Sequence, residues 1–333
     1  MATTPLIVLH DHLDGGLRPA TLLDLARTHK YSQLPTWDVE ELTHVLHAPA
    51  GSDLVRYLES FIHPLAVLQT QEALERVAYE AVCDWQQDGV IYGEIRFAPE
   101  LHMRNGLTMQ QACQAVLKGL SQGPVPSRLI VTAMRNQRSS LEAATVAAEL
   151  QHLGVVGFDL AGPEIGWPLH AHREAIALAK DAGLGITLHA GEAGGPHAVA
   201  EALDLGASRI GHGVTAVSEP AVLRRLRDSG TLLEVCVTSN LQTGVAPDVV
   251  SHPIQQLLQA GVRVSLQADN RTVSNTTASK EHDLVMTAHN WSVNTLTESL
   301  FSAVQGTFLS HTEKRALESQ LRDRLSDLSP SPL

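Results

Sequence analysis

The chain of 333 residues has 24 Lys and Arg against 36 Asp and Glu, a formal net charge of -12, and 44% of its residues are hydrophobic. This length and hydrophobic fraction are sufficient for a large buried core. The acidic balance leaves no basic surface that would hold a polyanion against competing salt, so we expect no nucleic-acid partner.

Neither the N-terminus nor the cysteines indicate export or membrane insertion. The first apolar run is too short for a signal peptide and has no basic leader. No apolar stretch approaches the ~20 residues of a transmembrane helix, so no membrane partner is expected. Cys83, Cys113 and Cys236 form no C-x-x-C pair and no even disulfide framework. We therefore expect a cytoplasmic protein, in which Cys236 is a buried thiol on a strand.

Short apolar runs alternate with longer amphipathic segments along the chain. Eight runs are predicted to be strands: residues 6–9, 90–97, 129–134, 155–160, 185–188, 209–210, 232–237 and 262–266. The segments between them have apolar residues at helical spacing, and five end in Gly. Continuous apolar strands are typical of a parallel sheet that is covered on both faces. The order predicts an α/β protein with a (β/α)8 TIM barrel.

The chain is longer than the ~250 residues of a typical barrel, and the surplus lies mainly after the first strand. Residues of about 17–64 have a helical pattern and are expected to form extra helices inserted there. Four apolar side chains of this insertion could form a lid over a binding site or pack the helices together, and the sequence favours neither role. They are Trp37, Leu54, Tyr57 and Phe61. No linker or repeat divides the chain, so residues 1–333 are interpreted as one domain.

The first strand ends in two histidines, His10 and His12, which share a face because side chains alternate along a strand. This pair alone does not distinguish metal ligands from incidental polar residues, since 17 histidines make chance pairs common. His170 and His172 have the same spacing. They lie at the start of an expected helix, where residues two apart do not face each other, so both are expected at the surface.

Other polar residues follow other strands at the same end. His189 and Glu192 follow the fifth strand, His212 the sixth and Asp269 the last. In a parallel barrel the carboxyl ends of all strands lie on one rim, where such enzymes have their catalytic groups. Separate structural roles would require several coincidences, so we expect one site at this rim.

The expected donors are three imidazoles and a carboxylate without a thiolate, which suit one catalytic Zn²⁺ per chain. Glu192 is then expected to act as a proton carrier. His212 would orient or deprotonate a metal-bound water, whose pKa the ion lowers to about 7. These roles predict hydrolysis by attack of hydroxide on an electrophilic carbon. The expected ligands are His10, His12, His189 and Asp269.

Several motifs in this order resemble the metal-dependent adenosine deaminases. The motifs are HDHLDG, FDLAGPE, LHAGE, RIGHGV, VCVTSNLQTG and QADNRTVS, and the variants TSNLQTG and ADNR resemble the bacterial branch. The resemblance extends from residue 6 to about residue 282. It implies a (β/α)8 barrel with extra helices after the first strand, a zinc ion, and a purine nucleoside as substrate. The implied reaction converts adenosine, and also 2′-deoxyadenosine, to inosine and ammonia in purine salvage.

The resemblance also implies roles for single residues. Glu192 would protonate N1 of the purine as hydroxide adds to C6, and His212 would assist that hydroxide. Asp269 would both bind zinc and accept a hydrogen bond from the activated water. The backbone N–H of Gly162 would contact N3 of the base, and Asp14 would hold the ribose hydroxyls.

Three further positions complete the implied site. His12 would contact the substrate as well as the metal, and Asp159 would be a pocket carboxylate beside the metal. Asn270 stands where many members have a second Asp, and it should donate a hydrogen bond to N7. An amide donates without an unusual protonation state, so this substitution is chemically reasonable. Pro163 follows Gly162 where an acidic or small residue is commoner, and it stiffens that loop.

Related substrates remain as alternatives. Adenine deaminases commonly have a longer Glu at the first motif, and the shorter Asp14 leaves room for a ribose. An AMP-type substrate would require cations for its phosphate, and only Arg18 lies near this motif. Aminodeoxyfutalosine and N6-substituted AMP are further alternatives, as is a non-catalytic zinc- or purine-binding relative. Glu192 and His212 argue against the last, because a binding protein needs no proton carriers.

Overall fold

The computed structural model describes residues 4–328, in which eight parallel strands form one sheet in chain order. Every strand overlaps a predicted run, and helices follow the strands, so the predicted (β/α)8 fold is confirmed. The seventh strand is shorter than predicted, because a helix begins at Val237. The strands are β1 (Leu6–Val8), β2 (Val90–Phe97), β3 (Ser127–Met134), β4 (Val155–Ala161), β5 (Gly185–Ala190), β6 (Arg209–His212), β7 (Leu232–Val235) and β8 (Arg263–Leu266).

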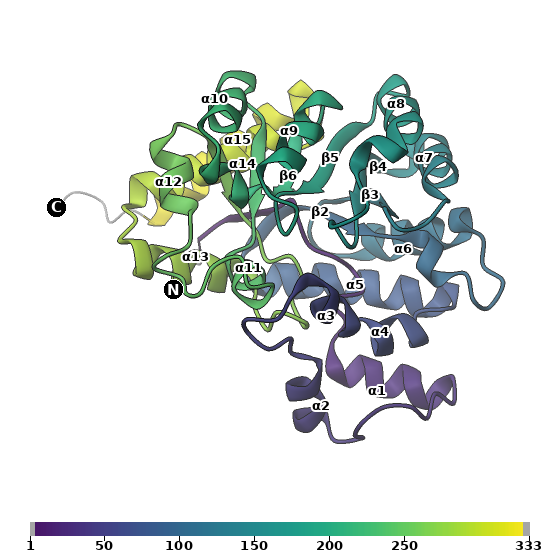
Figure 1. Ribbon diagram of the computed structural model, residues 1–333. Helices are drawn as coiled ribbons and strands as arrows, with labels where there is room; N and C mark the ends of the chain where they lie inside the picture. Colours follow the sequence, from purple (N-terminus) through teal and green to yellow (C-terminus); the bar gives the residue numbers. More distant parts are fainter. Residues whose placement is uncertain (1–3, 329–333) are drawn as a thin grey trace.

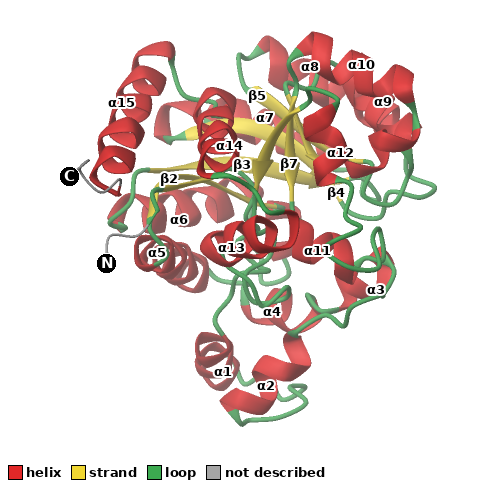
Figure 2. Cartoon of the chain, turned by 90° about the vertical axis from the view of Figure 1, so that its left-hand side faces the viewer, coloured by secondary structure: helices red, strands yellow, loops and turns green. Residues whose placement is uncertain are grey.

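Helices surround these strands on the outside (Figures 1 and 2). Short 3-10 helices lie at Pro99–His102, Gln151–Leu153, Leu169–His172 and Val214–Ser218. The helices of this outer layer and of the C-terminal region are α5 (Gln71–Gln87), α6 (Met109–Gln122), α7 (Ser140–Glu149), α8 (Arg173–Asp181), α9 (Pro196–Asp204), α10 (Pro220–Ser229), α11 (Val237–Gln242), α12 (Ile254–Gln259), α13 (Ala278–His289), α14 (Val293–Gly306) and α15 (His311–Leu328).

Local sequence explains where α6 begins and how closely it packs. Oγ1 of Thr108 accepts the backbone N–H of Gln111, whose Oε1 accepts the backbone N–H of Thr108, which is a capping box. On its inner side, Gly119 contacts α5 directly. A Cβ at this position would lie 2.1 Å from the carbonyl oxygen of Glu75, so only glycine allows the two helices to approach this closely.

The barrel closes through residues that follow β1 and β8 rather than through the strands themselves. Asp11 and Asp269 form an isolated parallel bridge. The backbone N–H of His12 donates to the carbonyl oxygen of Asp269 at 2.7 Å, and that of Asp269 donates to His10 at 3.0 Å. Oε1 of Gln267 accepts the backbone N–H of His10 at 3.2 Å. The closing hydrogen bonds therefore fix the backbone of three predicted site residues.

The extra helices predicted for about residues 17–64 are present between β1 and α5. They are α1 (Pro19–Thr28), α2 (Val39–Leu46), α3 (Leu54–Glu59) and α4 (Ile62–Val67). In Figures 1 and 2, α1 and α2 extend away from the strands, whereas α3 and α4 lie closer to them. The segment around α3 and α4 contributes to a small hydrophobic cluster, separate from the main core: Ala48, Leu54, Tyr57, Phe61 and Val273.

Two local predictions are wrong. His172 is buried rather than exposed, because Nδ1 lies 2.8 Å from Oγ of Ser140 and Nε2 lies 2.9 Å from the carbonyl oxygen of Arg135. His170 is exposed as predicted. Cys236 is a buried thiol as predicted, but it immediately precedes α11 instead of lying on β7. In both cases the sequence pattern did not show where the strand or turn ends.

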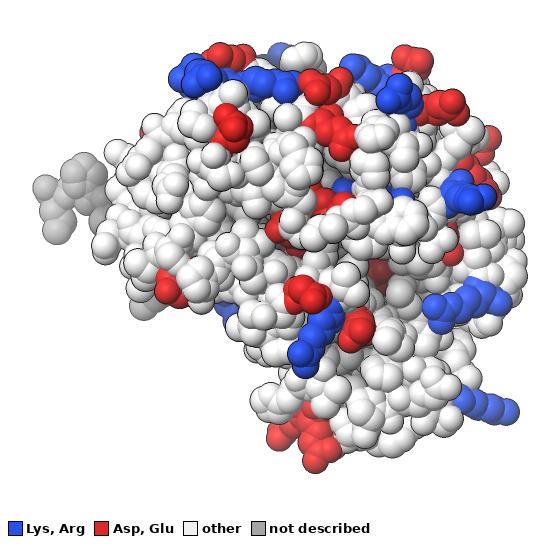
Figure 3. Space-filling view, in the orientation of Figure 1, with Lys and Arg blue, Asp and Glu red and all other residues white. Residues whose placement is uncertain are grey.

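On the face of the molecule shown in Figure 3, Lys and Arg side chains of the described residues are scattered, and many lie beside acidic ones. Within residues 4–328, no helix is both long enough and apolar enough to cross a membrane.

Candidate active site

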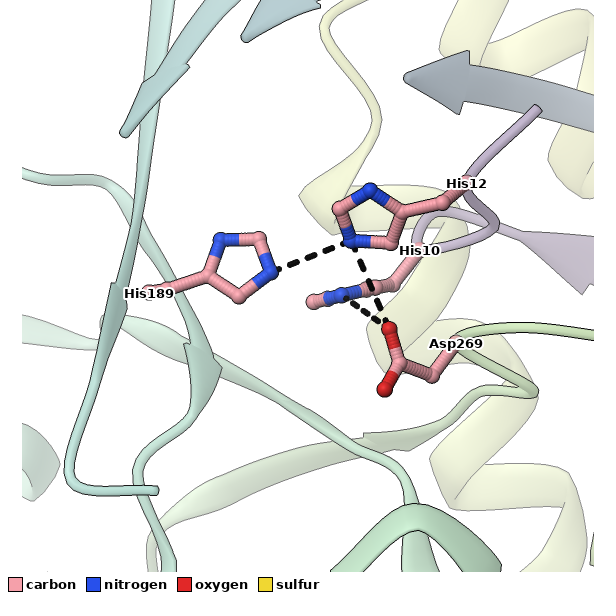
Figure 4. Close-up of side chains that lie close together, drawn as sticks. All are labelled: His10, His12, His189 and Asp269. Carbon is pink, nitrogen blue, oxygen red and sulfur yellow. Dashed lines mark hydrogen bonds and ion pairs between the residues drawn. The ribbon is translucent and has the colours of Figure 1, made fainter. Parts of the chain in front are cut away.

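Four predicted ligands converge at the carboxyl ends of the strands (Figure 4). Each offers one donor atom, and these four atoms lie within 4.8 Å of one another. Nε2 of His12 lies 3.2 Å from Nε2 of His189, and Oδ1 of Asp269 lies 3.2 Å from Nε2 of His10. Nε2 of His10 is buried and has no hydrogen-bond partner among the described residues. A buried nitrogen without a partner, beside imidazole and carboxylate donors, fits a zinc site.

The alternation of side chains after β1 is as predicted. His10 and His12 point toward the cluster, whereas the intervening Asp11 points toward the outer helices. Oδ2 of Asp11 accepts a hydrogen bond from Nε1 of Trp85 at 2.6 Å and pairs with Nε of Arg271 at 2.7 Å. The two histidines therefore lie on one face of the chain, and Asp11 is held by its partners on the opposite face.

Two buried carboxylates orient two of these histidines. Nδ1 of His10 lies 2.9 Å from Oε2 of Glu234, and Nδ1 of His189 lies 3.0 Å from Oδ1 of Asp159. If each Nδ1–H donates to its carboxylate, the lone pair of Nε2 is directed at the cluster, as a metal ligand requires. The guanidinium of Arg96 joins the two carboxylates, at 2.7 Å from Glu234 and 3.3 Å from Asp159.

The position of Asp159 corrects one prediction. Its carboxylate is completely buried behind His189, where it also accepts a hydrogen bond from Oγ1 of Thr132 at 3.1 Å. It does not line the cavity described below, so the predicted place in the pocket is wrong. Asp159 positions a histidine instead of facing a substrate.

Sequence reasoning did not identify Glu234 and Arg96 as part of the site. Burial alone would raise the pKa of Glu234, but Arg96 and Arg209 hold that pKa well below its usual range. Glu234 interrupts the otherwise apolar strand LLEV, and Arg96 lies with Glu94 in the buried strand that contains GEIRF. A charged residue within a buried strand almost always has a charged partner, and this was the available signal.

Glu192 and His212 lie beside the cluster with opposite shifts in pKa. Burial, and then the charges of Asp269 and Glu164, raise the pKa of Glu192 well above its usual value. Burial lowers the pKa of His212 well below its usual value. Nε2 of His212 lies 3.7 Å from Oε2 of Glu192. Burial therefore favours the protonated form of Glu192 and the neutral form of His212 side by side, which suits proton transfer.

The loop that contains Glu192 is held by a second carboxylate that sequence reasoning missed. Glu164 accepts hydrogen bonds from four consecutive backbone N–H groups, those of Gly191 at 2.6 Å, Glu192 at 3.1 Å, Ala193 at 2.6 Å and Gly194 at 2.7 Å. A Cβ on Gly194 would lie 2.7 Å from Cδ of Glu164. The glycines after LHAGE and the Glu of AGPE were the signal for this contact.

Two of the site residues have strained backbones. His212 has a φ of 64° and Asp269 a φ of 63°, both in the left-handed region that residues other than glycine rarely adopt. Such conformations cost about 1–3 kcal/mol each and concentrate at functional sites. The hydrogen bonds of barrel closure hold Asp269 in this conformation.

A cavity of about 310 Å³ lies over the cluster. One wall is apolar and comes largely from α3 and α4, and no Lys or Arg of the described residues lines it. Three insertion residues both line the cavity and pack together, namely Leu54, Tyr57 and Phe61. Trp37 is 44% exposed and takes no part. The predicted substrate-binding residues at the cavity are His12, Asp14, Gly162 and Asn270.

Comparisons with known proteins agree with this geometry. The family model described as adenosine deaminase matches residues 5–324. The adenosine deaminase of Mycobacterium avium (strain 104) is 41% identical over 339 residues, covering 94% of this chain and 93% of that protein. The structure of adenine deaminase from Arthrobacter aurescens has a TM-score of 0.88 at 25% identity, covering 97% of this chain and 100% of the other. The N6-methyl-AMP deaminase of Arabidopsis thaliana has a TM-score of 0.86 at 26% identity, covering 97% of each chain. The chain therefore belongs to the adenosine deaminase family.

Proposed function

We propose that this chain hydrolyses adenosine and 2′-deoxyadenosine to inosine and ammonia at one zinc ion. The family is one of hydrolytic deaminases, and the relative at 41% identity is an adenosine deaminase. The observation that best supports the proposal is that three of the four residues of the metal-ligand cluster line one cavity together with Glu192 and His212. The residues proposed to hold the zinc are His10, His12, His189 and Asp269.

When bound, the zinc would supply a Lewis acid that makes water a nucleophile at neutral pH. Glu192, whose pKa burial raises, donates its proton to N1 of the purine. His212 accepts or holds a proton of the attacking water, and Asp269 accepts a hydrogen bond from it. Water adds at C6. The amino group then takes up the proton held by His212 and leaves as ammonia when the C6–N bond breaks, and the proton of the new C6 hydroxyl returns to Glu192 as the carbonyl of inosine forms. These groups are fixed before the substrate binds, which lowers the cost of reaching the transition state.

The proposed substrate contacts line the same cavity as the cluster. The carboxylate of Asp14 would accept hydrogen bonds from the ribose, and burial raises the pKa of this group to about 6, so it is ionised at neutral pH. The backbone N–H of Gly162 would donate to N3, and the amide of Asn270 to N7. Apolar side chains such as Leu58 and Phe61 would cover the base.

The cavity favours a nucleoside over a nucleotide. A bound phosphate would require cationic partners, and none of the described Lys or Arg residues lines this cavity. Arg18, the cation nearest to the first motif along the sequence, is paired with Asp84, with Nε at 3.0 Å from Oδ1. We therefore propose that this chain discriminates against AMP and N6-methyl-AMP, although it shares its fold with a deaminase of the latter.

We also infer that the reaction takes place in the cytoplasm. The three cysteines are all unpaired in the structure, and two of them are buried. Unpaired cysteines are typical of proteins in a reducing compartment.

One assay tests the proposed function. Zinc-loaded protein is given adenosine, 2′-deoxyadenosine, adenine, AMP, N6-methyl-AMP and aminodeoxyfutalosine, and the change of the purine ultraviolet band is followed. We expect the first two to be converted, and conversion to stop after chelation and return with zinc. No conversion of adenosine by the zinc-loaded protein would overturn the proposal. Faster conversion of AMP than of adenosine would overturn the nucleoside assignment.

A further inference from the structure

The hydroxyl of Tyr57 connects the inserted helix α3 to the residue that follows the ligand Asp269. Its oxygen lies 2.8 Å from Nδ2 of Asn270 and 2.8 Å from Oγ of Ser274. Tyr57 and Asn270 are each 2% exposed and both line the cavity. A buried polar link therefore joins the inserted helix α3 to the residue beside Asp269.

The hydrogen bonds around this hydroxyl favour one orientation of the Asn270 amide. Tyr57 can donate its proton to Ser274 and still accept one N–H of Asn270. The second N–H of Asn270 then remains available to a ligand in the cavity. Oδ1 of Asn270 is buried and has no hydrogen-bond partner among the described residues. It faces Gly15 so closely that a Cβ at that position would lie 1.8 Å from it.

The reverse amide orientation is less favourable. It would turn the NH2 group of Asn270 away from the Tyr57 hydroxyl and place it beside Gly15, and a buried donor that is left unpaired there would be costly. The orientation that Tyr57 favours is therefore the one that keeps a donor for the cavity. The hydroxyl of Tyr57 thus favours one of the two orientations of the Asn270 amide.

The hydrogen bond between Tyr57 and Asn270 also depends on the position of α3 against the loop after β8. The segment that leads into α3 is attached to the loop after β8, because the backbone N–H of Ala48 donates to the carbonyl oxygen of Val273 at 2.9 Å. Leu54 and Phe61 pack with Val273 in the small hydrophobic cluster. Moving α3 away from this loop would remove the Tyr57 hydroxyl from Asn270.

We propose that Tyr57 is a positioning residue that directs an N–H of Asn270 toward N7 of the purine. The inference rests on the proposed function, because it assumes a purine in the cavity. It makes recognition of one ring nitrogen dependent on the packing of α3 against the loop after β8. Purines that have an acceptor at position 7 are favoured, and 7-deaza analogues, which have a C–H there, lose this contact.

Ligand binding tests this proposal without turnover. The dissociation constants of inosine and 7-deazainosine are measured by calorimetry on zinc-loaded wild type and Tyr57→Phe, which keeps the ring and its packing. We expect the wild type to bind inosine about three- to tenfold more tightly than 7-deazainosine, as for one neutral hydrogen bond. In Tyr57→Phe this ratio should approach one, mainly because inosine binds more weakly.

A matched control is available in the same insertion. Tyr31→Phe removes a hydroxyl that lies 2.8 Å from Nδ1 of His63 and does not line the cavity, so the binding ratio should remain as in wild type. Asn270→Ala should also reduce the ratio, and the double variant should add little to either single change.

The outcomes separate this inference from the proposed function. If Tyr57 acts only through packing, Tyr57→Phe keeps that packing and leaves the ratio of the two dissociation constants unchanged, which overturns the inference. If the wild type deaminates adenosine but does not distinguish the two ligands, the inference also fails while the proposed function stands. If the wild type neither binds inosine nor deaminates adenosine, the proposed function fails, and the inference fails with it.

Discussion

Glu234 lies directly behind His10, with its Oε2 at 2.9 Å from Nδ1 of the imidazole, and neither side chain contacts solvent. The same oxygen lies 2.7 Å from Nη2 of Arg96. The orientation of a proposed zinc ligand therefore depends on an ion pair inside the barrel. Partners of this kind are worth about 10- to 100-fold in metal affinity or activity.

The Glu234→Gln variant should bind zinc about 10- to 100-fold more weakly than wild type. Gln can still accept a hydrogen bond from His10, but it has no negative charge to attract the imidazole and the guanidinium groups of Arg96 and Arg209. Zinc affinity is measured by competition with a chromophoric chelator. Glu149→Gln, an exposed change on α7, is the control for the same chemical substitution. Unchanged zinc affinity in Glu234→Gln would show that the carboxylate has no part in orienting the ligand.

The Glu192→Gln variant should retain zinc and lose about 10²- to 10⁴-fold in kcat, because an amide cannot deliver a proton to N1. Metal content is measured by elemental analysis, and kcat by the ultraviolet assay with adenosine. Glu59→Gln, which removes an exposed carboxylate from α3, should retain full activity. Turnover of Glu192→Gln at the wild-type rate would contradict the proposed acid.

The Glu164→Gln variant should loosen the loop that contains Glu192. One carboxylate now accepts four backbone N–H groups, whereas the amide has a single acceptor oxygen and would place N–H groups against donors. We expect the free energy of unfolding to fall by about 2–3 kcal/mol. Amide hydrogen exchange at residues 191–194 should become faster in the variant. Exchange as slow as in wild type would mean that the loop is held by other contacts.

The stability contribution of His102 should depend on pH. Its side chain is buried, Nδ1 lies 2.7 Å from the carbonyl oxygen of Leu68, and burial lowers its pKa from 6.5 to about 4. Between these values the unfolded chain binds a proton at His102 that the folded chain does not. The contribution of neutral His102 to the free energy of unfolding is therefore fully present above about pH 6.5 and is lost as the pH falls toward 4.

The His102→Asn variant isolates this effect, because Asn can donate to Leu68 but does not titrate. Free energies of unfolding are measured in urea for both proteins at pH 7.5 and 4.5. Relative to that of wild type, the free energy of unfolding of the variant should rise by on the order of 2–3 kcal/mol between pH 7.5 and pH 4.5. An equal difference between the two proteins at both pH values would show that His102 titrates alike in the folded and unfolded chains.

The sequence by itself determined the order of the elements and the spacing of the first two histidines. Apolar runs form strands because hydrophobicity and β-propensity are local properties, so every predicted strand has a counterpart in the fold. Side chains alternate along an extended chain wherever it lies, and His10 and His12 therefore face the same way. The shared rim of a parallel barrel then brought His189, His212 and Asp269 together.

The tertiary structure decided which side chains support those residues. Glu234 and His10 are 224 positions apart in the chain, and no local pattern relates them. The burial of Asp159 behind His189, the four backbone contacts of Glu164, and the contact of Tyr57 with Asn270 likewise depend on how distant segments pack. The sequence specifies which chemical groups reach the rim through local periodicity. Only packing decides which buried charges orient them, because a charge in a dry interior is stable only beside partners that the complete fold supplies.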